Sequence, residues 1–322
     1  MTIKESSSPK ELTQRFTPFE KPVNPIKAPV FDLTPEQQDK YDKVLAHFTS
    51  LDGIAMNEEA PAKSPITDAE KSWLTKEQFL RYLRATKWNV TNAIKRIEET
   101  MIWRRSFGCS GTETDLLTAE LISEENETGK MFIFGYDNDN RPCLYLRNGY
   151  QNTKPSIKQV QHLVFMLEKV ITFMPPGQDT LALLIDNKPP DSKFVSSKFP
   201  PLGITKQCLH ILQYHYPERL GKGLFTNLNW LFWGFLKLSG PFIDPYTRSK
   251  TVYDVPFVDY VPAEQLDKEF NGSADFQYKH EQYWPTMLKM AEERHRTYVR
   301  NFERLGGKIG LSEYDLRLPL ED

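Results

Sequence analysis

The chain has 322 residues, of which 41 are Lys or Arg and 43 are Asp or Glu, giving a formal net charge of -2. This balance argues against a general nucleic-acid binder, which would carry a clear basic surplus or patch. Hydrophobic residues make up 39% and aromatic residues 12%, which is enough for a substantial core outside the polar N-terminus.

Cysteine usage and hydropathy indicate where the protein resides. The three cysteines, Cys109, Cys143 and Cys208, are widely spaced and form no CxxC pair. They predict neither a disulfide framework nor a zinc knuckle, and favour a reduced, cytosolic protein. The N-terminus lacks an apolar signal-peptide core, and no run of about 18 apolar residues occurs. We therefore expect a soluble protein whose contact with any membrane is peripheral.

The first third of the chain predicts a disordered segment followed by a small helical domain. Residues 1–33 are rich in Ser, Pro, Lys and Glu and have few periodic hydrophobic residues, so we expect them to be mostly disordered. Helix-start signals with Thr as the N-cap then follow at Thr34, Thr67 and Thr75. Apolar residues recur at helical spacing over 90–107. These signals predict an all-helical domain over residues 34–110.

Strands alternate with helices after about residue 128. The expected strands are 131–136, 143–147, 180–186, 222–227 and 250–255, and the expected helices are 156–174, 205–214 and 280–305. The continuous apolar run at 180–186 fits a strand that is buried on both faces of a parallel sheet. The alternation implies an α/β domain, which we assign to 111–285, leaving 286–322 as a C-terminal helix and tail.

Two polar motifs flank one of the most apolar stretches of the chain. Residues 216–222 read Tyr-Pro-Glu-Arg-Leu-Gly-Lys, and residues 244–250 read Asp-Pro-Tyr-Thr-Arg-Ser-Lys. They supply a carboxylate that can accept hydrogen bonds from hydroxyls, cations suited to a phosphate, and a hydroxyl. Alternatively, the first is a surface ion pair beside a turn and the second a type I turn in a solvated loop. Their pairing around an apolar segment suits a ligand with a phosphate-bearing head and a hydrocarbon tail.

The apolar stretch at 229–240 allows two interpretations. A helix that is apolar nearly all round is usually part of a core. The two tryptophans would instead suit a mobile lid that covers a cavity and meets a membrane interface, where the indole N–H stays hydrated. The candidate lid residues are Trp230, Leu231, Phe232, Trp233, Phe235 and Leu236.

Signatures of catalysis and of metal binding are missing from the sequence. There is no GxSxG or GxxxxGK[ST] motif, and the Gly221-Lys-Gly223 segment lacks the third glycine of a dinucleotide fingerprint. The six histidines show no metal-binding spacing, and the acidic turn at 137–140 lacks the Gly and Glu of an EF-hand. We expect no enzyme activity, no cofactor and no metal.

Three segments together resemble the CRAL-TRIO lipid-transfer family. They are Leu80-Arg-Tyr-Leu-Arg-Ala-Thr-Lys-Trp88 with the following Trp103-Arg-Arg105, the 216–222 motif, and the second motif extended back to Pro241. The resemblance covers about residues 35–305 and is strongest to fungal phosphatidylinositol transfer proteins of the pleiotropic-drug-resistance subgroup. It implies an α/β lipid-binding domain with a mixed, mainly parallel sheet and a large apolar cavity, preceded by a small all-helical domain.

The resemblance also implies a headgroup site and a gate. Glu218 and Lys250 match positions that bind the inositol headgroup and its phosphate, and Thr247, Asp244 and Arg219 match neighbouring headgroup positions. The stretch from Trp230 to Leu238 falls where the gating helix of the family lies.

Two departures from the family pattern bear on the ligands. Thr86 stands where many relatives have Arg near the headgroup region, which weakens any role for residue 86. The segment 187–193 shows no match to the Ser/Thr-containing segment of relatives that also carry phosphatidylcholine. The resemblance therefore favours a sterol-type second ligand over phosphatidylcholine.

The implied function is transfer of phosphatidylinositol together with a second apolar lipid, linking phosphoinositide and sterol metabolism and azole tolerance. The implied partners are membrane lipids and a phosphatidylinositol 4-kinase. The implied location is the cytoplasm, with peripheral contact at the endoplasmic reticulum, lipid droplets or the cell periphery. Alternatives are a lipid sensor that presents phosphatidylinositol to the kinase without transfer and, disfavoured, a lipid-metabolising enzyme.

Overall fold

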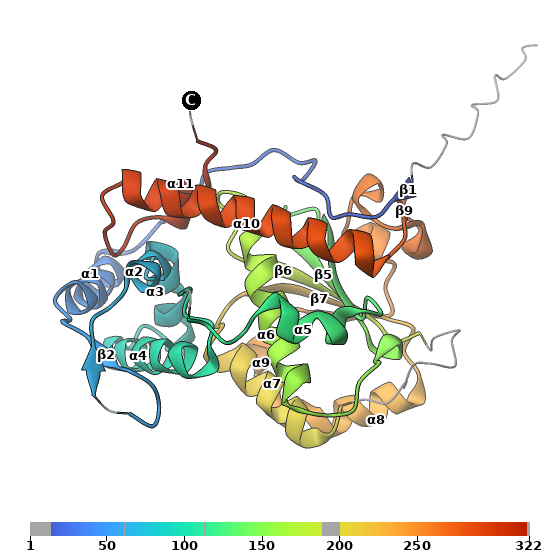
Figure 1. The fold of residues 1–322 in the computed structure, drawn as a ribbon, viewed down its shortest axis with the longest axis horizontal. Helices are drawn as coiled ribbons and strands as arrows, with labels where there is room; N and C mark the ends of the chain where they lie inside the picture. The colour runs from blue at the N-terminus through green and yellow to red at the C-terminus, as the bar shows by residue number, and fades with distance from the viewer. Residues whose placement is uncertain (1–13, 61, 113, 189–199, 321–322) are drawn as a thin grey trace, which may run out of the picture.

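The computed structural model describes residues 14–60, 62–112, 114–188 and 200–320. A bundle of helices from the first third of the chain lies beside a domain built on a central sheet, at the left and right of Figure 1. The long helix α10 (His280–Arg304) runs along both parts and contacts helices of each. The predicted division into a helical and an α/β part is therefore confirmed within these ranges.

The helical domain follows the predicted capping signals. Its elements are α1 (Pro35–Thr49), β2 (Ile54–Ala55), β3 (Lys63–Ser64), α2 (Asp68–Trp73), α3 (Lys76–Ala85) and α4 (Val90–Phe107). Thr34 and Thr67 form complete capping boxes, whereas Thr75 caps α3 only by accepting from the Gln78 amide. Strands β2 and β3 pair antiparallel. Buried side chains of α1, α3 and α4 form a separate small core, in which the Phe48 and Phe79 rings stack.

The α/β domain confirms the predicted alternation. Its elements are α5 (Ala119–Asn126), β4 (Met131–Tyr136), β5 (Pro142–Arg147), α6 (Ile157–Thr172), β6 (Leu181–Asp186), α7 (Leu202–Tyr214), β7 (Leu220–Thr226), α8 (Trp230–Ser239), α9 (Pro245–Ser249) and β8 (Thr251–Tyr253). Short 3-10 helices are η1 (Asn148–Tyr150), η2 (Gly240–Phe242), η3 (Phe257–Asp259), η4 (Ala263–Gln265) and η5 (Lys268–Phe270).

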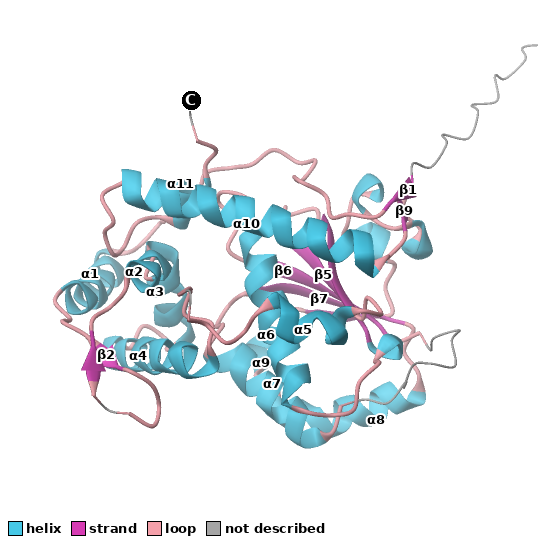
Figure 2. Ribbon diagram, in the orientation of Figure 1, coloured by secondary structure: helices cyan, strands magenta, loops and turns pink. Residues whose placement is uncertain are grey.

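The five-stranded sheet has the order β4-β5-β6-β7-β8 (Figure 2). Only the β4–β5 pair is antiparallel, so the sheet is mixed and mainly parallel, as predicted. The alternation along β6 shows why its sequence is continuously apolar. Ala182 and Leu184 are buried in the main core, whereas Leu181, Leu183 and Ile185 face a cavity on the other side.

The N-terminal segment differs from the expectation of disorder. Within it, β1 (Gln14–Arg15) pairs parallel with β9 (Asp275–Phe276), and the Phe19 ring packs 4.9 Å from the Phe134 ring. Figure 1 shows this segment running along the same side of the molecule as α10. Its anchors are isolated residues in a Pro-rich stretch, so they leave no periodic signal. Residues 1–13 lie outside the described part of the chain.

Two further expectations needed correction. The proposed boundary after residue 285 falls inside α10, which is continuous from His280, and a last short helix, α11 (Glu313–Arg317), packs back against α10. Residues 244–247 form a helix start rather than an isolated type I turn. Asp244 is the N-cap of α9 and accepts from the Thr247 amide at 2.8 Å. Asp followed by Pro is favoured both at a helix N-terminus and in a type I turn, so the local sequence does not distinguish the two conformations.

Candidate functional site

A cavity of about 1680 Å³ lies between one face of the sheet and helices α6, α7 and α8. Alternate residues of the strands form one wall, and apolar side chains such as Leu163, Leu167 and Leu212 from the helices form the other. This volume exceeds that of sites for drug-sized ligands, which is roughly 300–1,000 Å³. The cavity can therefore hold a ligand with long hydrocarbon chains.

Glu218 stands at the polar end of this cavity, on the turn between α7 and β7. Its backbone has φ 61°, in the left-handed region that is costly for a non-glycine residue. Its side chain is 15% exposed, and its Oε2 accepts from Arg84 Nε at 2.8 Å. Its other oxygen, Oε1, accepts no hydrogen bond from the described residues, so it is open to donors from a ligand.

Lys250 is the C-cap of α9 and directly precedes β8, the strand that pairs with β7. Its Nζ donates to the Leu220 carbonyl at 2.7 Å and lies 3.9 Å from the centroid of the Tyr246 ring. Burial lowers the pKa of Lys250, and the nearby Glu218 carboxylate partly opposes this. Within the described ranges no carboxylate lies within 4.0 Å of this ammonium group. A partly buried cation without an ionic partner favours an anionic ligand such as a phosphate.

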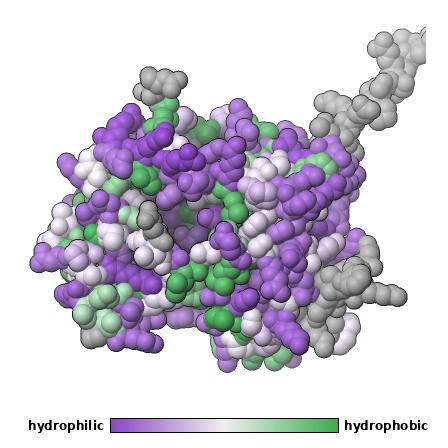
Figure 3. Space-filling model, in the orientation of Figure 1, coloured by the Kyte–Doolittle hydropathy of each residue, from purple (hydrophilic) through white to green (hydrophobic). Residues whose placement is uncertain are grey.

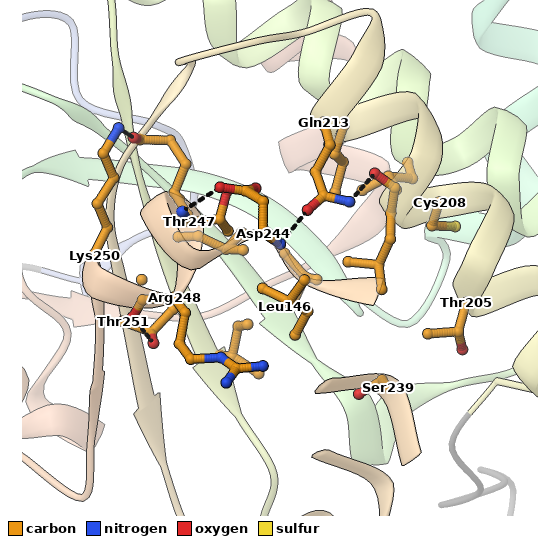
Figure 4. A pocket seen from close by; sticks show the side chains of 18 of the residues that line it. Leu146, Thr205, Cys208, Gln213, Ser239, Asp244, Thr247, Arg248, Lys250 and Thr251 are labelled. Atoms are coloured by element: carbon orange, nitrogen blue, oxygen red, sulfur yellow. Dashed lines mark hydrogen bonds between the residues drawn. The ribbon is translucent and has the colours of Figure 1, made fainter. Parts of the chain in front are cut away.

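Asp244 and Thr247 form a rigid frame beside Lys250. The Thr247 hydroxyl donates to the Asp244 carboxylate, which also caps α9. Gln213, reaching across from α7, accepts from the Asp244 amide at 2.7 Å and donates to the Phe242 carbonyl at 2.8 Å (Figure 4). Both Asp244 and Thr247 line the cavity, and their mutual hydrogen bonds hold the loop that carries Lys250.

The side chains of Arg219 and Thr86 are bound to other parts of the protein rather than open to the polar end of the cavity. Arg219 borders the cavity, but its buried guanidinium donates to the Asp179 carbonyl at 2.9 Å and pairs with Glu313 at 3.3 Å. The Thr86 hydroxyl donates to the Tyr82 carbonyl at 2.9 Å and ends α3. Most of the segment 187–193, on which the phosphatidylcholine prediction depends, lies outside the described residues.

Sequence reasoning missed two cations at the polar end. Arg84 and Lys87, from the end of α3 and the residues after it, both line the cavity. Lys87 has a positive φ of 53° and makes no ion pair among the described residues. Both belong to the Leu80–Trp88 motif that carried the resemblance, so a signal was present. Their proximity to Glu218 depends on the packing of one domain against the other, which the motif does not reveal.

Helix α8 covers the cavity and is not a core helix. Phe232 is 3% exposed and, with Phe235 and Leu236, lines the cavity, whereas Trp230 is 79% and Trp233 47% exposed. In Figure 3 hydrophilic residues cover most of the visible face, and hydrophobic ones gather near its lower edge, over α7. No described helix is long and apolar enough to cross a bilayer. The side chain of Leu231 lies outside the described part.

Comparisons with known proteins identify the family of this chain. The model of the CRAL/TRIO N-terminal domain matches residues 40–99, and that of the CRAL/TRIO domain matches residues 126–272. A CRAL-TRIO domain-containing protein of Schizosaccharomyces pombe is 46% identical over 90% of this chain, which spans only 28% of that relative. The phosphatidylinositol transfer protein PDR17 of Saccharomyces cerevisiae is 43% identical over 90% of this chain and 86% of its own length.

A solved structure shares the fold. The crystal structure of Sfh5 superimposes with a TM-score of 0.51 at 18% identity, over 83% of this chain and 99% of that one. The two family models, the extensive identity to the yeast relatives and the shared fold lead to one assignment: this chain belongs to the CRAL/TRIO family.

Proposed function

We propose that this protein binds phosphatidylinositol in the cavity and transfers it between membranes. The observation that carries the proposal is the polar end of the cavity, where the Glu218 carboxylate lies near the Lys250 ammonium, which has no ionic partner in the described part of the chain. The inositol hydroxyls would donate to Glu218, and the phosphate would accept from Lys250. The name of the PDR17 relative, a phosphatidylinositol transfer protein, supports the same ligand.

The apolar remainder of the cavity would hold the acyl chains. Each buried CH₂ gains roughly 0.8 kcal/mol relative to water. A bilayer offers the same gain, so the transfer of chains from membrane to cavity is nearly balanced in free energy. The headgroup contacts would therefore decide which lipid is loaded, and no covalent chemistry is needed.

We propose that α8 acts as a gate that opens at a membrane surface. Its inner residues line the cavity, Trp233 borders the cavity and is 47% exposed, and Trp230 is 79% exposed. Lys237 on α8 and Arg248 on α9 are also exposed. Exposed indole rings together with cations suit the interface of an anionic membrane.

The proposal also includes a second, apolar lipid that enters the same cavity. We propose a sterol, because the cavity walls are largely apolar and suit a rigid apolar body that carries a single hydroxyl. A cytoplasmic location with peripheral membrane contact fits such exchange. Presentation of phosphatidylinositol to a phosphatidylinositol 4-kinase and an effect on azole tolerance stay predictions from the resemblance.

The test is transfer of labelled lipids between vesicles. The double variant Glu218→Ala/Lys250→Ala should lose phosphatidylinositol transfer while its thermal unfolding in the absence of lipid stays near that of the wild type. Thr86→Ala, outside the cavity end, serves as the control and should transfer normally. Normal transfer by the double variant would refute the site. Wild-type transfer of phosphatidylcholine as fast as of phosphatidylinositol would refute the proposed lipid selection.

A further inference from the structure

The turn that carries Glu218 keeps a strained backbone at the edge of the cavity. Glu218 has φ 61°, in the left-handed region, and directly follows Pro217. A non-glycine residue keeps such a conformation only where the surrounding structure holds it on both sides. The contacts of the two flanking side chains, Tyr216 and Arg219, therefore help to determine where the Glu218 carboxylate points.

Side chains of α6 and α4 hold the first flank of this turn. Tyr216 is 6% exposed, and its hydroxyl donates to the Glu168 carboxylate on α6. Arg104, on α4, binds both oxygens of the same carboxylate, at 2.7 and 3.1 Å. A bidentate pair of this kind fixes the direction of both partners. The Tyr216 side of the turn is thus anchored to two helices.

Glu313, on α11, holds the second flank. Its carboxylate is 4% exposed, lies 3.3 Å from Arg219 Nη2 and also accepts from Arg81 on α3. The Arg219 guanidinium donates in addition to the backbone carbonyl of Asp179 at 2.9 Å. The residue next to Glu218 is therefore anchored by a carboxylate that lies 94 residues further along the chain.

A second branch of the same network leads from Glu313 to Arg84. Arg81, which is bound to Glu313, donates to Asp179 Oδ2 at 3.3 Å. The same oxygen lies 3.8 Å from Arg84 Nη2, while Arg84 Nε donates to Glu218. Asp179 thus connects the buried pair to the arginine that orients Glu218.

The two carboxylates of the network differ in exposure. The Glu313 side chain is surrounded by three guanidinium groups, the third being that of Arg317 at 2.9 Å. A charged acceptor that binds several guanidinium groups fixes their positions relative to one another. The Asp179 side chain is 33% exposed, so its charge can be removed with a smaller effect on folding.

We propose that Glu313 and Asp179 are positioning residues for the inositol headgroup: neither lines the cavity, yet together they direct the Glu218 carboxylate toward it. Glu313 acts through Arg219 on the backbone of the turn. Asp179 acts through Arg84 on the carboxylate itself. The segment that follows α10 thereby contributes to lipid selection. This inference rests on the proposed function, because it takes Glu218 to receive the inositol hydroxyls.

The test measures headgroup selectivity rather than transfer alone. Phosphatidylinositol and phosphatidylglycerol carry the same phosphodiester charge and can carry the same acyl chains, but their hydroxyls differ. Competition of each lipid with a fluorescent phosphatidylinositol gives the two dissociation constants. Glu313→Gln and Asp179→Asn should each lower the preference for phosphatidylinositol roughly 3- to 30-fold. A merely destabilised protein loses both lipids in proportion, since unfolding removes binding sites for each alike, and its preference stays unchanged.

Glu70→Gln is the matched control. Glu70 is also a buried carboxylate, 5% exposed, and forms two hydrogen bonds with Arg105 inside the helical domain. Neither residue lines the cavity. The replacement therefore removes a buried paired charge, as Glu313→Gln does, but should leave the preference at the wild-type value.

A spectroscopic measurement reports on the position of Glu218 without lipid. The Nε–H group of Arg84 donates to Glu218 and should give a distinct nitrogen-15 resonance, assigned by its absence in Arg84→Gln. Asp179→Asn should move this resonance toward that of a solvent-exposed arginine, and Glu70→Gln should not. If Glu313→Gln does not fold, Glu313→Asp takes its place. That variant keeps the charge but retracts the carboxylate by one methylene group, so it should lower the preference in the same direction.

The outcomes separate this inference from the proposed function. A wild-type preference in the folded Glu313 variant would overturn the role of Glu313. A wild-type preference together with an unmoved Arg84 resonance in Asp179→Asn would overturn the role of Asp179. Failure of the wild-type protein to prefer phosphatidylinositol would instead overturn the proposed function, and the Arg84 resonance would still show whether the network positions Glu218.

Discussion

Arg84 at the end of α3 donates its Nε to Glu218 Oε2 at 2.8 Å, across 134 residues of sequence. The helical domain thereby supplies one side of the polar end of the cavity. The pair holds one oxygen of Glu218 and leaves the other for a ligand. The headgroup site is therefore shared between the two domains and depends on their relative position.

Arg84→Gln should lower phosphatidylinositol transfer by about tenfold, because Glu218 loses the partner that orients it. The free energy of unfolding should change by less than about 1 kcal/mol, since the Arg84 side chain is 40% exposed and the pair is screened by solvent. Arg296→Gln, which removes an exposed arginine on α10, is the control. Assays of phosphatidylinositol transfer with both variants test this prediction. Equal transfer by the two variants would contradict a headgroup site shared between the domains.

Replacing Trp230 and Trp233 by Ala should slow lipid exchange more than it weakens the affinity for loaded lipid. Trp230 lies outside the cavity and Trp233 borders it while 47% exposed, so opening at the membrane is the step that should suffer. Stopped-flow exchange of a fluorescent phosphatidylinositol, beside equilibrium binding, measures the two effects. Leu305→Ala, another exposed apolar residue, is the control. A parallel loss of exchange and folding stability would instead indicate that α8 has a purely structural role.

Gln213→Leu should loosen the connection between α8 and α9. The amide of Gln213 bonds the Phe242 carbonyl and the Asp244 amide, and both would be left without these partners. We expect a loss of about 1–3 kcal/mol and faster hydrogen exchange at 240–244. Gln207→Leu, on an exposed position of the same helix, should show neither change. Unchanged exchange at 240–244 in Gln213→Leu would show that this contact does not hold the gate.

Glu313 gives the fold a defined dependence on acid. Burial alone would raise the pKa of this carboxyl, but the guanidinium groups of Arg219, Arg81 and Arg317 hold it well below its usual value of 4.5. Because the folded-state pKa is lowered, the stabilisation is complete above about pH 4.5 and is lost as pH falls toward the folded-state value.

Glu313→Gln should therefore destabilise the protein at pH 7 by about 3–5 kcal/mol, because it leaves buried arginines without their counter-charge. The difference from the wild type should shrink only well below pH 4.5. Urea unfolding at a series of pH values measures this, with the exposed Glu292→Gln as the control. A difference that stays constant down to the acid transition would mean that the charge of Glu313 does not cause the stabilisation.

Local signals determined most of the elements. Thr34 and Thr67 cap helices as predicted because a capping box uses only atoms within four residues. The apolar run before Asp186 forms the central strand because an unbroken run of apolar residues, without alternation, already reflects burial on two faces. Glu218 and Lys250 could be selected for their chemistry and their position beside an apolar segment, although their role stays a prediction.

The tertiary structure decided what those residues meet. Arg219 has the same charge as Lys250, yet its guanidinium pairs with Glu313 whereas the Lys250 ammonium keeps no carboxylate among the described residues. Trp230 and Phe232 are equally apolar, yet α8 exposes one and buries the other. Composition and periodicity report which environment a side chain can tolerate. Which partner it finds depends on contacts between segments far apart in sequence, and those form only when the chain folds into its tertiary structure.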